Sequence, residues 1–315
     1  MSPGAETTRP ATEISVVVPI YNEGPNLREL HRRIVATLEA LGRSFEIVAV
    51  DDGSSDGSVE TLKAIRAEDP RLRVVQLARN FGQGPAIYAG FAHVRGKIVC
   101  LLDADLQNPP EELPKLIAKI DEGYDYVGGR RHGRHESFSR RLGSQFLNYI
   151  IRRTTRTAFY DMGCALKAFR REVTDHLVRF THHSRYLPVD LAWLGVRMIE
   201  VEVAHNERAV GESKYGPLKL LRTSFDLVTG ITSAPLQFLS PLGFVFATVG
   251  FLMAIRVLYV RLIHGDNSQI ATVVALFFVL SGVQLIATGL MCEYISRIYV
   301  EVQNRPYYVV KDVDE

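Results

Sequence analysis

The sequence predicts an α/β fold with a mostly parallel sheet, followed by a C-terminal pair of apolar helices. Short apolar runs alternate with amphipathic stretches from residue 14 to about residue 130, which is the pattern of a parallel sheet with helices on both faces. Polar turn sequences follow most of these runs. Near the C-terminus, two long apolar stretches, which together contain one charged residue, predict helices long enough to cross a membrane.

Four apolar runs are expected to form the centre of the sheet, with amphipathic helices between them. The strands are expected at 14–19 (ISVVVP), 45–50 (FEIVAV), 73–77 (RVVQL) and 97–102 (KIVCLL). The helices are expected at 26–41, 58–68 and 84–93, and prolines 109, 110 and 114 open a further one. Ligands of such sheets bind at the carboxyl ends of the strands, so those ends are searched first for a site.

The following stretch is less regular. Short strands are expected at 125–128, 165–170 and 198–203, with a helix at 188–195 between the last two. Residues 217–233 are amphipathic and basic at their start, which predicts a helix lying on a membrane surface.

The two apolar stretches predict a transmembrane hairpin. Residues 241–260 carry only Arg256 and residues 270–292 carry no charge, and each reaches the roughly 20 residues that cross a bilayer. Fully buried helices of a large soluble core are the alternative, but these stretches leave no polar face for water. Basic residues flank the pair, whereas the loop between offers Arg261 alone, so the positive-inside rule places both ends in the cytoplasm. The flanking residues are Lys214, Lys219, Arg222, Arg297, Arg305 and Lys311.

Composition excludes several classes. The 37 basic and 35 acidic residues nearly balance, which argues against a dedicated nucleic-acid binder. The three cysteines lack the paired spacing of zinc or redox sites, so a reducing compartment is expected. Residues 1–12 are polar and are expected to be a disordered tail without a secretory signal.

The most informative motif is the acidic end of the fourth apolar run, IVCLLDADLQ. Asp103 and Asp105 are two apart, so on an extended segment their carboxylates point the same way and can bind one hard cation, with Gln107 adding a third oxygen. A divalent ion there would face a diphosphate. A calcium loop is excluded because Asn108 stands where glycine is needed and Pro114 where glutamate is needed. A phosphatase of the Asp-x-Asp type remains open from the motif alone.

Polar residues also follow the other strands. The first ends in the turn 19–24 (PIYNEG), and after the second, Asp52 is a candidate to accept the imide N–H of a uracil or a ribose hydroxyl. Ser55 or Asp56 can start the next helix. Gly82 and Gly84 resemble the start of a dinucleotide fingerprint, but Gly90 comes too late for one, so a glycine turn at a diphosphate is the better interpretation. No Walker A sequence occurs, which excludes the ordinary NTPases.

Arginines gather between residues 130 and 141, where a solvated surface is the default interpretation of such a run. In a protein with a membrane hairpin, an anionic lipid phosphate is the better partner, and two arginines can hold it with forked hydrogen bonds. Residues 211–215 (GESKY) come just before the predicted membrane-surface helix. Asp161 enters an apolar stretch as either a helix cap or a site residue.

Taken together, VVVPIYNE, DDGSSDGS, LARNFGQ, LDADLQNPPEE, the segment around Asp161, GESKY and the hairpin resemble the polyprenyl-phosphate glycosyltransferases of glycosyltransferase family two. The resemblance covers nearly the whole chain. Within that family, DMGCALKAFRR, HNERAVGESKY and DLVTGIT are most similar to the bacterial undecaprenyl-phosphate formamidoarabinose transferases of lipid A modification. Relatives use UDP-glucose or GDP-mannose with dolichyl or undecaprenyl phosphate.

This resemblance implies a GT-A fold, Mg²⁺ or Mn²⁺ as cofactor, and a set of site residues. The implied metal ligands are Asp103, Asp105 and Gln107, and the implied nucleotide contacts are Pro19, Tyr21, Glu23, Asp52, Gly82 and Asp103. The resemblance also suggests Asp161 as the catalytic acid or base. From the arginine run and the GESKY segment, Arg130 and Arg141 are expected to take part in catalysis, and Arg140, Arg141, Ser213 and Lys214 are expected at the acceptor phosphate. Gln83 departs from the lysine of several relatives, which leaves one diphosphate contact open.

The expected function is inverting transfer of a sugar from a nucleotide-sugar, with UDP favoured, to a polyprenyl phosphate at the cytoplasmic face of the inner membrane. The expected parts are a catalytic domain at 13–210, a juxtamembrane segment at 211–239, the hairpin at 240–298 and a cytosolic tail at 299–315. A homo-oligomer, such as a tetramer, would form through the membrane helices. The alternatives are transfer from GDP-mannose, a membrane-anchored phosphatase and a lipid-binding scaffold. A processive synthase is not expected, because its Gln-x-x-Arg-Trp motif is absent.

Overall fold

A computed structural model describes residues 12–131, 164–180, 185, 187–204, 234–264 and 270–314. The chain divides into two compact units. The first comprises Met1–Lys214 together with Pro306–Glu315, and the second is Tyr215–Arg305.

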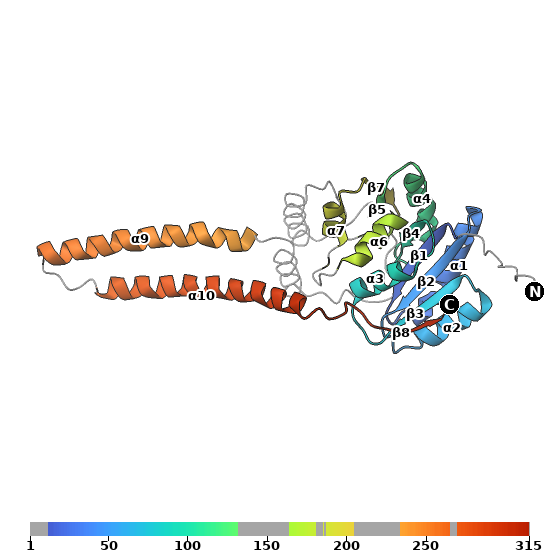
Figure 1. Cartoon of the computed structure of the whole chain (residues 1–315), viewed down its shortest axis with the longest axis horizontal. Coiled ribbons are helices and arrows are strands. Elements are labelled where there is room, and N and C mark those ends of the chain that lie inside the picture. The colour runs from blue at the N-terminus through green and yellow to red at the C-terminus, as the bar shows by residue number, and fades with distance from the viewer. Residues whose placement is uncertain are drawn as a thin grey trace, which may run out of the picture. The chain divides into compact units, whose positions relative to one another are not determined.

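The first unit is an α/β domain built on an eight-stranded sheet with the order β7-β5-β6-β4-β1-β2-β3-β8 (Figure 1). Its central strands β1, β2, β3 and β4 run parallel, as does β5 beside β7, whereas β6 and β8 pair antiparallel with their neighbours. The strands are β1 (Ile14–Ile20), β2 (Phe45–Asp51), β3 (Leu72–Leu77), β4 (Ile98–Leu101), β5 (Tyr126–Arg131), β6 (Lys167–Arg170), β7 (Met198–Val203) and β8 (Val310–Asp314). The predicted α/β class with a mostly parallel sheet is confirmed.

Helices cover both faces of this sheet because its strands are apolar on both sides. Val16 and Val18 of β1 belong to one buried cluster and Val17 to another. The first cluster includes side chains of α1 (Leu27–Ala40), α2 (Ser58–Glu68) and α4 (Leu113–Asp121), and the second includes those of α3 (Gln83–His93), α6 (Arg171–Arg179) and α7 (Leu187–Leu194). Short 3-10 turns, η1 (Gly24–Asn26) and η2 (Pro110–Glu112), precede α1 and α4.

The strand register brings the polar strand ends together. Ile20, the last residue of β1, lies opposite Asp51 at the end of β2, and Val17 of β1 lies opposite Leu101 at the end of β4. The carboxyl ends of these three strands therefore meet at one edge of the sheet, where ligands of such folds bind.

Two elements of the first unit differ from the sequence-based expectation. Helix α6 was not expected, although Val173 and Leu177 lie four residues apart and are both buried. Residues 310–314, expected within a tail, form β8, which pairs antiparallel with the edge strand β3. Arg66 of α2 donates through Nε to Asp314 at 2.9 Å, so the end of the chain is fixed to the domain by an ion pair as well as by the sheet.

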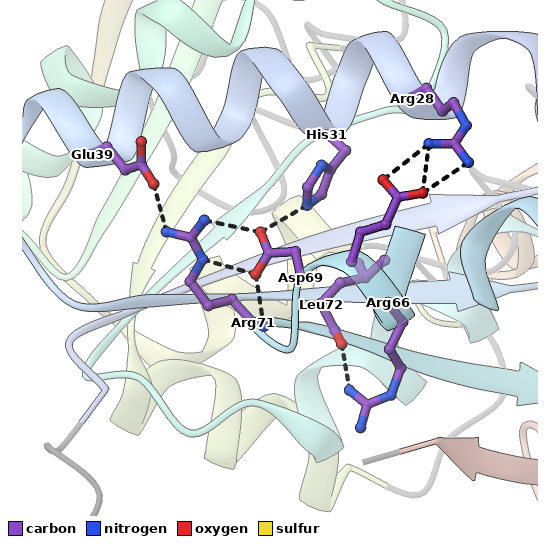
Figure 2. Close-up of polar contacts among 8 residues, drawn as sticks. Arg28, His31, Glu39, Arg66, Asp69, Arg71 and Leu72 are labelled. Carbon is purple, nitrogen blue, oxygen red and sulfur yellow. Dashed lines mark hydrogen bonds and ion pairs between the residues drawn. The ribbon is translucent and has the colours of Figure 1, made fainter. Parts of the chain in front are cut away.

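A polar network ties α1 to the turn between α2 and β3 (Figure 2). Asp69 is almost fully buried, and its carboxylate accepts from Nε and Nη2 of Arg71 at 2.9 and 3.0 Å and lies 3.1 Å from Nε2 of His31. Arg71 also donates to Glu39 of α1 at 2.8 Å. Burial lowers the pKa of His31, against the opposing effect of the Asp69 charge.

The second unit contains two long helices, α9 (Ala234–His264) and α10 (Ile270–Val302), which contact each other. They include the candidate membrane spans Pro241–Val260 and Val279–Val302, with mean hydropathies of 2.0 and 1.3. No part of either span is buried, whereas the core helix of a soluble protein would be. The two helices are consistent with the expected hairpin, and the helix expected at 217–233 lies outside the described residues.

Candidate active site

A cavity of about 370 Å³ lies at the edge of the sheet where β1, β2 and β4 end, beside the first turn of α3. It brings together residues that are far apart in the sequence and that come from four strand-to-helix connections. The lining residues are Pro19, Ile20, Tyr21, Glu23, Asp52, Asn80, Gly82, Gln83, Ala86, Asp103, Ala104 and Asp105. Every nucleotide contact implied by the resemblance is in this set.

Asp103 and Asp105 both line the cavity, but a turn brings them there. Strand β4 ends at Leu101, and the chain then turns through Ala104 and Asp105 to Leu106, whose φ of 60° is in the left-handed region. The expectation that an extended segment would align the two carboxylates was therefore wrong. The turn produces the same result because both side chains still reach one cavity.

The two carboxylates act on each other electrostatically. Burial, followed by the negative charge of Asp105, raises the pKa of Asp103 to about 6. The charge of Lys167 and a hydrogen bond from Gln83 oppose this rise, with Gln83 Nε2 donating to Asp103 Oδ1 at 2.8 Å. Two carboxylates at one lip of a cavity suit a divalent cation, which would relieve their repulsion.

Gln107 contacts Asp105 through its backbone. Its backbone N–H donates to Oδ1 of Asp105 at 3.1 Å, and the residue is not among those lining the cavity. Within the described ranges, no group of three or more His, Cys, Asp or Glu side chains is placed to hold a metal. A cation here would thus rely on two aspartates, with its other ligands supplied by a diphosphate, water or an amide oxygen.

Reciprocal hydrogen bonds join the turn after β1 to the turn after β2. The backbone N–H of Asn22 donates to Ser54 Oγ at 3.0 Å, and that of Ser55 donates to Asn22 Oδ1 at 2.9 Å. The N–H of Gly24 donates to Asp56 Oδ2 at 3.0 Å. Asp56 also accepts from the backbone N–H of Ser58, the first residue of α2, at 3.1 Å, as expected for a residue that starts this helix. The same turn thus fixes the start of α2 and the segment that carries Tyr21 and Glu23 to the cavity.

Asp52 holds the glycine turn that precedes α3. Its Oδ1 accepts from the backbone N–H of Phe81 at 2.7 Å and its Oδ2 from that of Gly82 at 2.8 Å. Burial raises the pKa of Asp52 despite these two bonds. Gly53, with a φ of +71°, allows the approach, because a Cβ there would lie 2.6 Å from the backbone nitrogen of Asn80. Asp52, expected to bind a nucleoside, therefore also fixes the conformation of the glycine turn through its two hydrogen bonds.

The first turn of α3 lies at the cavity, which Gly82, Gln83 and Ala86 help to line. Gly82 precedes the helix with a φ of +104°, and no side chain caps it. The first N–H groups of any helix lack intrahelical acceptors, so those of Gln83 and Gly84 suit an anion such as a diphosphate. Pro85 has no N–H, and Ala86 donates back to Gly82 at 3.2 Å.

The remaining expected site residues lie away from this cavity or outside the described residues. Arg130, on β5, forms an exposed ion pair with Glu202 of β7 at 3.2 Å and does not line the cavity. Asp161, Arg140, Arg141, Ser213 and Lys214 lie outside the described residues.

Sequence reasoning missed two contributors to the site. Asn80 lines the cavity, and its position directly before the glycine turn was the available signal. Lys167 is buried, and its charge acts on Asp103 because β6 pairs with β4, where it lies opposite Leu101. No local signal marks Lys167, because that pairing joins segments separated by more than sixty residues.

Comparison with known proteins identifies a family and a fold. The family described as Glycosyl transferase family 2 matches residues 15–178. The structure of mannosyl-3-phosphoglycerate synthase from Rubrobacter xylanophilus is similar, with a TM-score of 0.54 and 16% sequence identity over 70% of this chain and 73% of that one.

Glucosyl-3-phosphoglycerate synthase from Mycobacterium tuberculosis is also similar. In complex with Mn²⁺, uridine diphosphate and phosphoglyceric acid it matches with a TM-score of 0.52 and 20% identity, covering 70% of this chain and 78% of that one. In complex with Mg²⁺ and uridine diphosphate the TM-score is 0.51 at 18% identity, over 70% and 79% of the two chains. These similarities support the GT-A-like fold.

Proposed function

The chain belongs to glycosyl transferase family 2 and is a glycosyltransferase, and we propose that it is a membrane enzyme that moves a sugar from a nucleotide-sugar to a polyprenyl phosphate with inversion. The observation that carries this proposal is the single cavity that joins the acidic pair, the glycine turn and the turns after β1 and β2. The two apolar helices add the means to meet a lipid substrate.

The donor would lie along the edge of the sheet. Tyr21, half exposed at the cavity, offers a ring face for a base, and Asp52 and Glu23 offer oxygens to a nucleoside. The diphosphate would lie between the first turn of α3 and the pair Asp103 and Asp105. UDP is the favoured nucleotide, since the similar mycobacterial enzyme was solved in complex with uridine diphosphate.

Asp103 and Asp105 would hold Mg²⁺ or Mn²⁺, with Gln107 as a proposed third ligand. Bound there, a divalent ion neutralises charge on a departing diphosphate. The similar mycobacterial enzyme was solved in complex with Mn²⁺ and with Mg²⁺. Gln83 would keep Oδ1 of Asp103 in place through its amide, leaving the other carboxylate oxygen for the cation.

The acceptor phosphate would be held by Arg140, Arg141, Ser213 and Lys214, with Arg130 and Arg141 orienting the attacking oxygen. That oxygen attacks the anomeric carbon from the face opposite the diphosphate, and the bond from this carbon to the diphosphate oxygen breaks in the same displacement. A phosphate monoester, with a second pKa of about 6, is already largely anionic near neutrality. Asp161 would therefore position the reactants more than remove a proton.

The pairing of β8 supports a two-pass topology. The residues before and after the hairpin, up to Lys214 and from Pro306, belong to one compact unit. A chain that leaves this unit, enters a bilayer and returns to the same unit must cross an even number of times. With the basic residues that flank the hairpin, this supports a catalytic domain on the cytoplasmic side of the inner membrane.

For the sugar we propose an aminoarabinose-type sugar, such as formamidoarabinose, or glucose, carried by UDP, with undecaprenyl phosphate as acceptor, because the sequence resembles the enzymes that transfer such sugars. GDP-mannose with a dolichyl-type phosphate is the alternative donor. Oligomers would form through α9 and α10.

A donor and acceptor screen tests this function. Purified full-length protein is incubated with Mn²⁺ and a panel of UDP- and GDP-sugars, with either a short polyprenyl phosphate or phosphoglyceric acid as acceptor, and products are read by mass spectrometry. We expect a glycosylated polyprenyl phosphate from a UDP-sugar, and loss of product in Asp105→Ala.

Three outcomes would change the proposal. Transfer to phosphoglyceric acid but not to the lipid would overturn the acceptor, and turnover of GDP-mannose alone would overturn the donor. Release of inorganic phosphate without sugar transfer would favour a phosphatase.

For the catalytic assignment, Asp161→Asn should lower kcat with donor binding intact, and near-normal turnover would contradict it.

A further inference from the structure

The segment Pro306–Glu315, which follows α10, belongs to the first unit and contacts the first turn of α3. Tyr307 is the key residue of this segment. A Cβ added at Gly84, the second residue of α3, would lie only 3.0 Å from the hydroxyl oxygen of Tyr307. The tip of the Tyr307 side chain is therefore in close contact with the helix turn whose N–H groups border the cavity.

The Tyr307 ring is held firmly at this place. It packs edge-on against Tyr88 of α3, with ring centroids 5.7 Å apart and an interplanar angle of 85°. The guanidinium of Arg185 lies over both rings, 4.6 Å from the centroid of Tyr307 and 4.4 Å from that of Tyr88. Tyr88 in turn donates its hydroxyl to the buried Asp190 at 2.8 Å. A ring fixed by these contacts cannot move aside easily.

We propose that Tyr307 is a positioning residue for the donor site, which supports the first turn of α3 so that the N–H groups of Gln83 and Gly84 point at the diphosphate. This inference rests on the proposed function, because it takes that turn to be the diphosphate site. It gives the end of the chain, which follows the second apolar helix, a direct part in donor binding.

The absence of a side chain at Gly84 follows from the same contact. Alanine is about 1 kcal/mol better than glycine within a helix, so Gly84→Ala would stabilise α3 if nothing opposed it. A methyl group at Gly84 would lie 3.0 Å from the hydroxyl oxygen of Tyr307, so the hydroxyl would have to move by a few tenths of an ångström. The glycine and the tyrosine should therefore behave as a coupled pair.

A double-mutant cycle tests this coupling. Binding of UDP with Mn²⁺ is measured by calorimetry, and the KM values for donor and lipid and kcat by initial rates, for the full-length protein. Inserting a methyl group into packed structure should make Gly84→Ala bind about tenfold more weakly, with a matching rise in donor KM and little change in kcat or lipid KM. Tyr307→Phe alone should cost about twofold, and the double variant should recover to about twofold of the wild type.

Tyr308→Phe is the matched control, since it removes a hydroxyl from the neighbouring residue but should not rescue Gly84→Ala. If Gly84→Ala does not fold, recovery of folding and nucleotide binding by Tyr307→Phe supports the contact, and failure to recover them overturns it. A Gly84→Ala protein that binds like the wild type, or a double variant as weak as Gly84→Ala, overturns the inference alone. A folded wild-type protein that binds no nucleotide overturns the proposed function instead.

Discussion

Replacing Asp103 with Asn should make the ligand-free protein more stable while abolishing its response to metal and nucleotide. The reason is that ionisation of this carboxyl group is less favourable in the folded protein than in the unfolded chain. Burial and the nearby Asp105 raise its pKa from 3.8 to about 6, so the folded state holds the ionised form less readily than the unfolded chain does. Asparagine keeps a similar shape and can still accept the hydrogen bond from Gln83, but it carries no charge.

The magnitude follows from linkage. A rise from 3.8 to about 6, at about 1.4 kcal/mol for each tenfold change in the ionisation constant, corresponds to a destabilisation of at most about 3 kcal/mol at neutral pH. This cost is absent below pH 3.8, where both states are protonated, and grows as pH rises through about 6. The stability advantage of Asp103→Asn should therefore be largest at neutral pH and shrink on acidification between those values.

The assay is thermal or urea unfolding followed by fluorescence, with and without Mn²⁺ and UDP. At a ligand concentration of about 100 times Kd, the wild type should gain about 2.7 kcal/mol and the variant nothing, so the ligand should nearly cancel the advantage of the variant. Asp121→Asn is a surface control: its exposed ion pair with Arg43 predicts a loss of at most about 1 kcal/mol, with the ligand response kept. An Asp103→Asn protein that is no more stable than the wild type near pH 7.5, or an advantage that does not depend on pH, would refute the reasoning.

Three further predictions concern Gly53 beside the cavity, the buried His31 and the two apolar helices. Gly53→Ala should abolish nucleotide binding and cost about 2 kcal/mol or more of stability, through backbone strain and overpacking. Gly42→Ala is the control, because Gly42 has a similar φ of +68° but no neighbouring atom within 4 Å, and it should leave binding intact. Equal losses of binding in the two variants, measured by calorimetry, would contradict this. The difference in free energy of unfolding between the wild type and His31→Gln, measured with urea, should shrink as pH falls from about 7.5 to about 5.5. Burial lowers the pKa of His31, so the folded wild-type protein loses stability as pH falls below 6.5, where this imidazole is protonated in the unfolded chain. A difference that does not change with pH would contradict this. Replacing residues 234–303 by a flexible linker while keeping Pro306–Asp314 should preserve nucleotide binding but slow transfer to long-chain lipid phosphate in vesicles about tenfold or more; undiminished transfer would remove the role of the hairpin.

The parts of the fold that follow from local pattern could be predicted from the sequence. The parallel centre of the sheet appeared as apolar runs separated by amphipathic stretches, and the observed boundaries there differ from the expected ones by at most one residue. Helix α6 was missed because its buried side chains Val173 and Leu177 stand among charged residues. Strand β8 was missed because three of its five residues are charged, which is common for a partly exposed edge strand.

The composition of the site was predictable where chemistry is concentrated at strand ends. Asp52, Asp103 and Asp105 follow buried strands. Burying a carboxylate costs free energy, so acidic residues at these positions indicate a functional role. Roles that depend on long-range contacts were not predictable. The contact of Gln83 with Asp103 requires α3 and β4 to be placed together, and the influence of Lys167 requires β6 to pair with β4.

The pairing of β8 with β3 also imposes an order on biogenesis. A ribosome releases residues 310–314 only after both apolar helices have been made, so β3 has no partner on its outer edge throughout most of translation. An unpaired edge strand is a template for aggregation, so the outer edge of β3 is open to wrong pairing until residues 310–314 reach it. The sheet reaches the width seen here only after β8 has paired with β3.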